Sequence, residues 1–225
     1  YLYERFDRED VDRYVRDYVK IRVDWATNEL GKPNPHLLTP PSEKQAWPKL
    51  GRLEAPRSGA ASAQEAPTIQ SNGLALTATM TCPAGDGVPH ALTTKVVLYR
   101  DRPWIDLEVT VHAKPADPWP EAGWICLPFD ARNPRFRLGR LGAIVDPVTE
   151  IVRGANKNIL AVNTGVAVLD DRGRGAGFCA LDDPLVSLGA PGCWRYDRDY
   201  TPGRPTVYVN VFNNQWSTNF RLWNS

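Results

Sequence analysis

Beyond Thr68, apolar and polar residues alternate in short runs separated by turn residues, and this pattern constrains the fold more than any other feature of the chain. In the clearest run, 105–112, four aliphatic residues alternate with Asp, Glu, Thr and His. A period of two is the repeat of a half-buried β-strand. Comparable runs span 74–79, 96–99, 124–129, 136–141, 159–169, 177–181 and 206–212. These runs follow one another too closely for the crossover helices that parallel strands require, so they predict antiparallel pairing.

The predicted fold class is therefore mainly β, an antiparallel β-sandwich. The runs 96–99 and 105–111 are separated by a turn around Asp101-Arg102-Pro103, which predicts a hairpin. Residues 173–177, Gly-Arg-Gly-Ala-Gly, predict a second hairpin turn, because they lack the Lys-Ser/Thr of a phosphate-binding loop and stand between two strands. No fixed-period repeat is visible, which disfavours a propeller or a solenoid.

The N-terminal part of the chain follows a helical period instead. Asp7 is a candidate N-cap with Asp10 three residues on, and an apolar stripe recurs at three- and four-residue steps. Its members are Val11, Tyr14, Val15, Tyr18, Ile21 and Trp25. The pattern predicts one amphipathic helix over residues 7–29. The proline-rich segment 31–48 predicts a connector, and the small, polar segment 55–67 predicts a surface loop.

Composition excludes some classes of partner and leaves the compartment open. The 225 residues include 27 Lys and Arg against 26 Asp and Glu, so there is no net field to attract nucleic acid. No apolar run reaches the roughly 20 residues of a membrane helix. The chain has no initiating Met and stops abruptly after Ser225, so we expect it to come from a longer polypeptide that could carry a targeting signal elsewhere. Its four Cys lack metal-ligand spacing and predict reduced thiols, although disulfides stay possible in an exported protein.

A search for catalytic groups finds no complete constellation. Asp106 and Glu108 share one strand face at about 7 Å, within the range of an inverting glycosidase pair, but alternation alone already predicts carboxylates there. The three histidines, His36, His90 and His112, show no metal-ligand spacing. No cofactor is predicted for these 225 residues.

Aromatic and amide residues are the candidate binding groups. The closing segment 213–225 crowds amides, hydroxyls, a guanidinium and two indoles behind a strand, and the loop around 193–197 adds further aromatic groups. Indoles cover the apolar face of a pyranose, while amides, hydroxyls and guanidinium groups bind its hydroxyls. The predicted carbohydrate-binding residues are Trp194, Tyr196, Asn213, Asn214, Trp216, Thr218, Asn219 and Arg221. The alternative is that the Trp side chains are buried and the amides belong to turns.

Four stretches of the chain resemble the region that follows the catalytic barrel in glycoside hydrolases similar to the class II α-mannosidases of family 38. They are Arg5–Val11 with Trp25–Lys32, the hairpin Val97–Arg100 with Leu107–Val109, Asn163–Leu185, and Asn213–Phe220. The resemblance implies a galactose-mutarotase-like β-supersandwich. It also implies that residues 1–30 are the helical remnant of a bundle, that 31–67 hold a connector, a first strand and a loop, and that 68–225 form the sandwich domain.

In enzymes of that kind, a zinc-binding His-x-Asp segment and an Asp nucleophile lie in an upstream barrel, and neither maps onto this chain. The resemblance therefore implies a zinc ion and catalysis in a preceding barrel of the parent chain, which would be the partner of this region together with carbohydrate. The resulting hypothesis is a non-catalytic, carbohydrate-contacting and structural β-sandwich domain. Two alternatives stay open: a sugar-active enzyme of aldose-epimerase type, using His112 with Asp106 or Glu108, and a purely structural domain.

Overall fold

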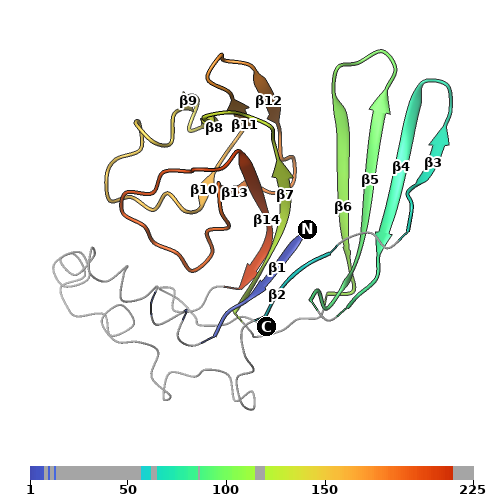
Figure 1. Cartoon of the computed structure of the whole chain (residues 1–225), viewed down its shortest axis with the longest axis horizontal. Coiled ribbons are helices and arrows are strands. Elements are labelled where there is room, and N and C mark those ends of the chain that lie inside the picture. Colours follow the sequence, from blue (N-terminus) through green and yellow to red (C-terminus); the bar gives the residue numbers. More distant parts are fainter. Residues whose placement is uncertain are drawn as a thin grey trace. The chain divides into compact units, whose positions relative to one another are not determined.

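The computed structural model describes residues 1–7, 10, 13, 57–61, 65–85, 87–114 and 120–214. The chain divides into two compact units. The first, here called the sheet unit, comprises Tyr1–Glu4 and Arg57–Asp117; the second, here called the sandwich unit, comprises Arg5–Pro56 and Pro118–Ser225. The strands of each unit are labelled in Figure 1, and each unit is described separately.

The sheet unit contains a four-stranded antiparallel meander in the order β3-β4-β5-β6. Its strands are β3 (Thr68–Ser71), β4 (Ala75–Cys82), β5 (Ala91–Tyr99) and β6 (Ile105–His112). The predicted hairpin is confirmed as β5 and β6 (Figure 1). Strands β1 (Leu2–Arg5) and β2 (Arg57–Ala60) are neighbours, and the amide of Ala61 donates to the carbonyl of Tyr1. The prediction of a loop over 55–67 is wrong at β2, because backbone pairing can form a strand where side chains give no alternation.

The meander has one apolar and one polar face, as the alternation predicts. Paired positions share a face, so the register aligns Leu76, Leu98 and Ile105 in one row across the sheet. Ala78, Val96 and Leu107 form the adjacent row. The opposite face carries Thr79, Lys95 and Glu108, then Thr77, Val97 and Asp106. Much of the apolar face is solvent-exposed near the β5–β6 turn.

The sandwich unit contains two antiparallel sheets. One has the order β10-β13-β14-β7, from β10 (Leu160–Ala161), β13 (Leu185–Leu188), β14 (Thr206–Asn214) and β7 (Glu121–Pro128). The other has the order β12-β11-β8-β9, from β12 (Gly175–Phe178), β11 (Gly165–Leu169), β8 (Arg135–Arg140) and β9 (Ala143–Val145). The predicted glycine-rich turn joins β11 to β12, with Gly175 and Gly177 already inside β12.

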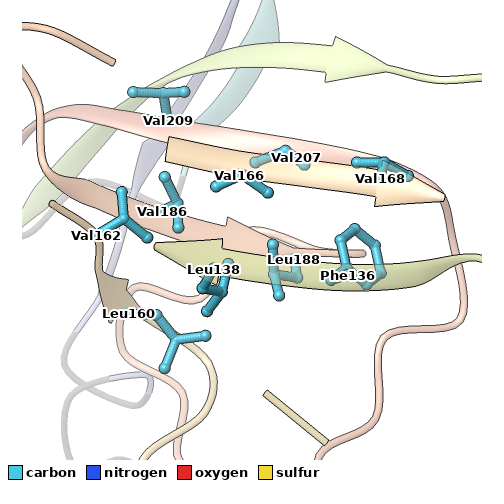
Figure 2. Packing of buried hydrophobic residues seen from close by; sticks show 10 residues of the cluster. All are labelled: Phe136, Leu138, Leu160, Val162, Val166, Val168, Val186, Leu188, Val207 and Val209. Carbon is cyan, nitrogen blue, oxygen red and sulfur yellow. The ribbon is translucent and has the colours of Figure 1, made fainter. Parts of the chain in front are cut away.

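A hydrophobic core joins these two sheets. Figure 2 shows its ten side chains: Phe136, Leu138, Leu160, Val162, Val166, Val168, Val186, Leu188, Val207 and Val209. They come from β8 and β11 of one sheet and from β10, β13 and β14 of the other, together with Val162 beside β10. Complete burial of such a side chain contributes about 1.5–3 kcal/mol. The prediction of a mainly β, antiparallel sandwich is therefore confirmed, and Trp124 of β7 is buried.

One predicted strand, 159–169, is divided into β10 and β11 in different sheets. The break lies at Asn163 and Thr164, whose amides both donate to the carbonyl of Gly139. Gly165 then has a φ of 141°, a conformation that favours glycine. The apolar pattern runs through this corner because both short strands contribute to the same core, so alternation alone does not reveal the change of sheet.

The predicted helix over 7–29 lies mostly outside the described residues. At its expected start, the Asp10 amide donates to Asp7 Oδ1 at 2.9 Å, and the Asp7 amide donates to Asp10 Oδ2 at 3.3 Å. This reciprocal pair has the form of a capping box, and Asp10 and Arg13 have helical conformation. Within the described ranges, no helix is long and apolar enough to cross a membrane.

Candidate functional site

Two of the predicted carbohydrate-binding residues, Trp194 and Tyr196, lie in the segment between β13 and β14. Both are buried, and the Trp194 side chain is only 1% exposed. The Tyr196 hydroxyl donates to the Gly154 carbonyl, and the Trp194 ring meets Phe6 edge-on at 6.4 Å. In this conformation the two rings pack inside the sandwich unit, so stacking a sugar on Trp194 would require the segment to open. A ligand contact there stays a prediction.

Asn213 and Asn214 end β14, opposite Ala122 and Glu121 of β7. Asn213 is exposed, and its Nδ2 donates to Asn210 Oδ1 at 2.6 Å. The remaining predicted residues, Trp216, Thr218, Asn219 and Arg221, lie outside the described residues. The amide and aromatic cluster of the closing segment is therefore untested.

The epimerase alternative uses His112 with Asp106 or Glu108, and these side chains share one face of β6 but lie far apart along the strand. At about 3.3 Å per residue, His112 lies about 13 Å from Glu108 and about 20 Å from Asp106 along the strand. Each group has a different partner: His112 Nε2 bonds Thr93 Oγ1 at 2.8 Å, and Glu108 pairs with Lys95 at 3.7 Å. The structure thus brings the imidazole near neither carboxylate, and a shared proton transfer would need both at hydrogen-bond distance.

The same face of the sheet unit does assemble an aromatic cluster at the β5–β6 turn. The register pairs Leu98 with Ile105, and one further step places Tyr99 opposite Trp104. The Arg102 guanidinium lies over both rings, 5.2 Å from the Tyr99 centroid and 5.4 Å from the Trp104 centroid. Such distances are those of cation–π contacts. We call Tyr99, Arg102, Trp104 and Asp106 the Trp104 platform.

Hydrogen bonding ties the platform to the sheet. The Tyr99 hydroxyl donates to Asp106 Oδ2 at 2.6 Å, and this bond, followed by partial desolvation and the Asp106 charge, raises the pKa of Tyr99 above its usual value. The bond also holds the Asp106 carboxylate in place beside the phenol. Arg102 Nε also lies 3.7 Å from Asp101 Oδ1, so this neighbouring carboxylate partly compensates the guanidinium charge.

The platform combines an accessible indole with fixed polar groups. Trp104 is 53% exposed, an unusual fraction for so large an apolar side chain. Arg102 has five N–H donors and Asp106 supplies carboxylate acceptors, so equatorial hydroxyls beside the indole could be bound from both. The sequence contains a signal for this pairing, because positions 99 and 104 each lie one residue nearer the turn than the paired residues Leu98 and Ile105. Alternation alone does not reveal it, since the turn interrupts the pattern.

In the ranges that the structure describes, no group of three or more His, Cys, Asp or Glu side chains could hold a metal ion. No disulfide joins the four cysteines, all of which lie in the described ranges; Cys193 is buried and Cys179 is exposed. The zinc ion implied by the family resemblance belongs to an upstream barrel, and the present residues do not test it.

Comparison of the chain with protein-family models, with curated proteins and with solved structures gives no match. The resemblance to the α-mannosidases of family 38 therefore stays a prediction.

Proposed function

We propose that this chain is a non-catalytic, carbohydrate-contacting β-sandwich module. The observation that carries the proposal is the Trp104 platform, an exposed indole in cation–π contact with Arg102, together with the Asp106 carboxylate that accepts a hydrogen bond from Tyr99. The C–H face of a pyranose is apolar and its rim is polar, which is the same division that the platform presents.

The arrangement favours binding over catalysis. Asp106 is engaged with the Tyr99 hydroxyl, and Glu108 lies in an ion pair with Lys95. Both carboxylates are exposed on an open sheet face. Catalytic carboxyl pairs usually lie in a closed, water-poor site, and neither group has such surroundings.

The wider proposal places the module in a mannosidase-like glycoside hydrolase, beside a catalytic barrel of the parent chain. It is based on the sequence resemblance alone. Within it, the residues Trp216, Asn219 and Arg221 would contact substrate from the closing segment, and a full-length reading frame with a His-x-Asp segment upstream of Tyr1 would support it.

The test is a titration of the chain with mannose and short mannosides, followed by Trp fluorescence and calorimetry. We expect a saturable fluorescence change that Trp104→Ala abolishes, with affinity reduced about tenfold or more because the stacking surface is removed. Ile105→Ala is the matched control: it is adjacent and similarly exposed but lies on the opposite face, so binding should be unchanged.

Three results would count against the proposal. Absence of any response supports a purely structural domain, and equal losses in both variants indicate a general effect on the hairpin. Mutarotation or mannoside hydrolysis by the pure chain would exclude a non-catalytic role.

A further inference from the structure

The sandwich unit contains a second candidate site, a cleft of about 460 Å³. One wall is the segment after β9, from Val148 to Lys157, and the other is Asp199–Thr201 from the segment between β13 and β14. All lining residues lie within the described part of this one unit. The volume suits a small organic molecule, since ligand pockets commonly span about 300–1,000 Å³.

An ion pair joins the two walls. Arg153 Nε and Nη2 donate to the two carboxylate oxygens of Asp199 at 2.8 and 3.1 Å, a bidentate geometry. This pair uses two of the five guanidinium N–H donors, so three remain for a ligand. Both Asp199 oxygens accept from Arg153, so the charge of this carboxylate is compensated by the ion pair.

Lys157 gives the cleft a buried cation. Its side chain belongs to a residue only 8% exposed, and Nζ donates to the Val148 carbonyl at 3.0 Å. That carbonyl is its only hydrogen-bond acceptor in the described structure, which leaves two ammonium donors. Removing an ammonium group from water is costly unless charge and hydrogen bonds compensate it. A neutral carbonyl compensates only part of this cost.

Positive charge also exceeds negative charge around the ion pair. The pKa of Asp199 is lowered first by its hydrogen bond from Arg153, and then, after some opposing desolvation, by the charges of Arg153, Arg198 and Lys157. Three cations thus act on one carboxylate. Glu150 lines the cleft as well, but one of its oxygens accepts the Asp146 amide at the turn after β9.

We propose that this cleft binds a small organic oxyanion, a molecule whose carboxylate or phosphate group is held by Lys157 Nζ and the free N–H donors of Arg153. The Thr149 and Thr201 side chains, which also line the cleft, supply hydroxyl groups for the rest of the ligand. The site is separate from the Trp104 platform and does not depend on the carbohydrate proposal.

The experiment is a binding titration of the chain with inorganic phosphate, with acetate and glucuronate as carboxylates, and with neutral mannose, followed by amide NMR shifts. We expect saturable shifts at residues 148–157 and 199–201 with at least one class of anion, and none there with mannose. Lys157→Gln should weaken anion binding at least about tenfold.

Because Lys157 is buried, Arg153→Gln serves as a second variant: its side chain is largely exposed, and its loss leaves Asp199 as an unpaired, repulsive carboxylate. This variant should also weaken binding at least about tenfold. Lys95→Gln removes an exposed cation in the sheet unit and should change nothing.

Saturation by phosphate alone or by carboxylates alone identifies the source of the oxyanion and supports the proposal. It is overturned if no anion shifts the cleft residues, if mannose shifts them equally, or if anion binding persists in both Arg153→Gln and Lys157→Gln.

Discussion

The two units of this molecule use the same sequence pattern with opposite outcomes. In the sandwich unit, the alternating aliphatic residues of β11, Val166 and Val168, are at most 3% exposed because a second sheet covers them. In the sheet unit, Ile105 and Leu107 of β6 alternate just as regularly, yet they are 58% and 42% exposed. Alternation therefore predicts a strand and its apolar face, but not whether anything covers that face.

The largest expected effect contrasts two leucines of similar pattern. Leu138→Ala in the sandwich core should lower the free energy of unfolding by about 2–5 kcal/mol, because it removes buried contacts and leaves a cavity. Leu107→Ala should cost less than about 1 kcal/mol, since its side chain is partly hydrated in the folded state. Urea denaturation measures both. Equal losses would mean that the apolar face of the sheet unit is covered in solution.

A smaller effect concerns the buried anchor of the sheet unit. His90 is buried, its Nε2 bonds the Tyr1 hydroxyl at 2.9 Å, and the rings of Tyr1 and Tyr3 contact it edge-on. Burial, and then the charge of Lys114, lower the pKa of His90 below 6.5. As pH falls below 6.5, the folded state therefore binds fewer protons than the unfolded state. The contribution of His90 to the free energy of unfolding is thus complete above that pH, and it is lost as pH falls through the lowered pKa.

His90→Gln should flatten this part of the stability–pH profile, measured as the urea midpoint of the sheet unit at several pH values between neutral and mildly acidic. The sandwich unit serves as the internal control, because no described histidine belongs to it. A profile that is unchanged in His90→Gln would show that other groups carry the acid sensitivity.

The smallest effect is expected on the polar face of the sheet. Lys95 and Glu108 are cross-strand partners whose charged atoms lie 3.7 Å apart, and both side chains are well exposed. Exposed pairs of this kind contribute about 0–1 kcal/mol. Replacing both by Thr should leave the urea midpoint nearly unchanged in high salt. A large loss would indicate that this face is not solvated.

Several elements could be predicted from the sequence with little help. The β5–β6 hairpin and the burial of Trp124 follow from alternation, turn residues and the apolar neighbours of that tryptophan. β2 was missed because Arg57–Ala60 has no apolar alternation, and its strand conformation comes from backbone pairing. The split at Asn163 was missed because both halves of the apolar run face the same core.

The candidate sites were less predictable. Trp194 was expected to contact ligand because turn residues surround it, yet a turn can fold its aromatic ring inward, as the contact with Phe6 shows. Trp104 lies beside a turn, where the alternation ends, and its place in the platform depends on Tyr99 and Arg102 lying close to it. The proposed oxyanion cleft joins residues far apart in the chain, such as Arg153 and Asp199, which are 46 positions apart and which no local pattern connects.

The sequence by itself determined the class of this protein: strands that pair antiparallel, one apolar face on each, and turns where Gly, Pro and Asp interrupt the pattern. These are local properties, set by the two-residue repeat of a strand and by the conformations that turn residues favour. Tertiary structure alone decided which apolar faces are covered and which distant side chains meet, as Arg153 and Asp199 do. Those outcomes depend on packing between segments far apart in the chain, and a local period carries no information about which segments become neighbours.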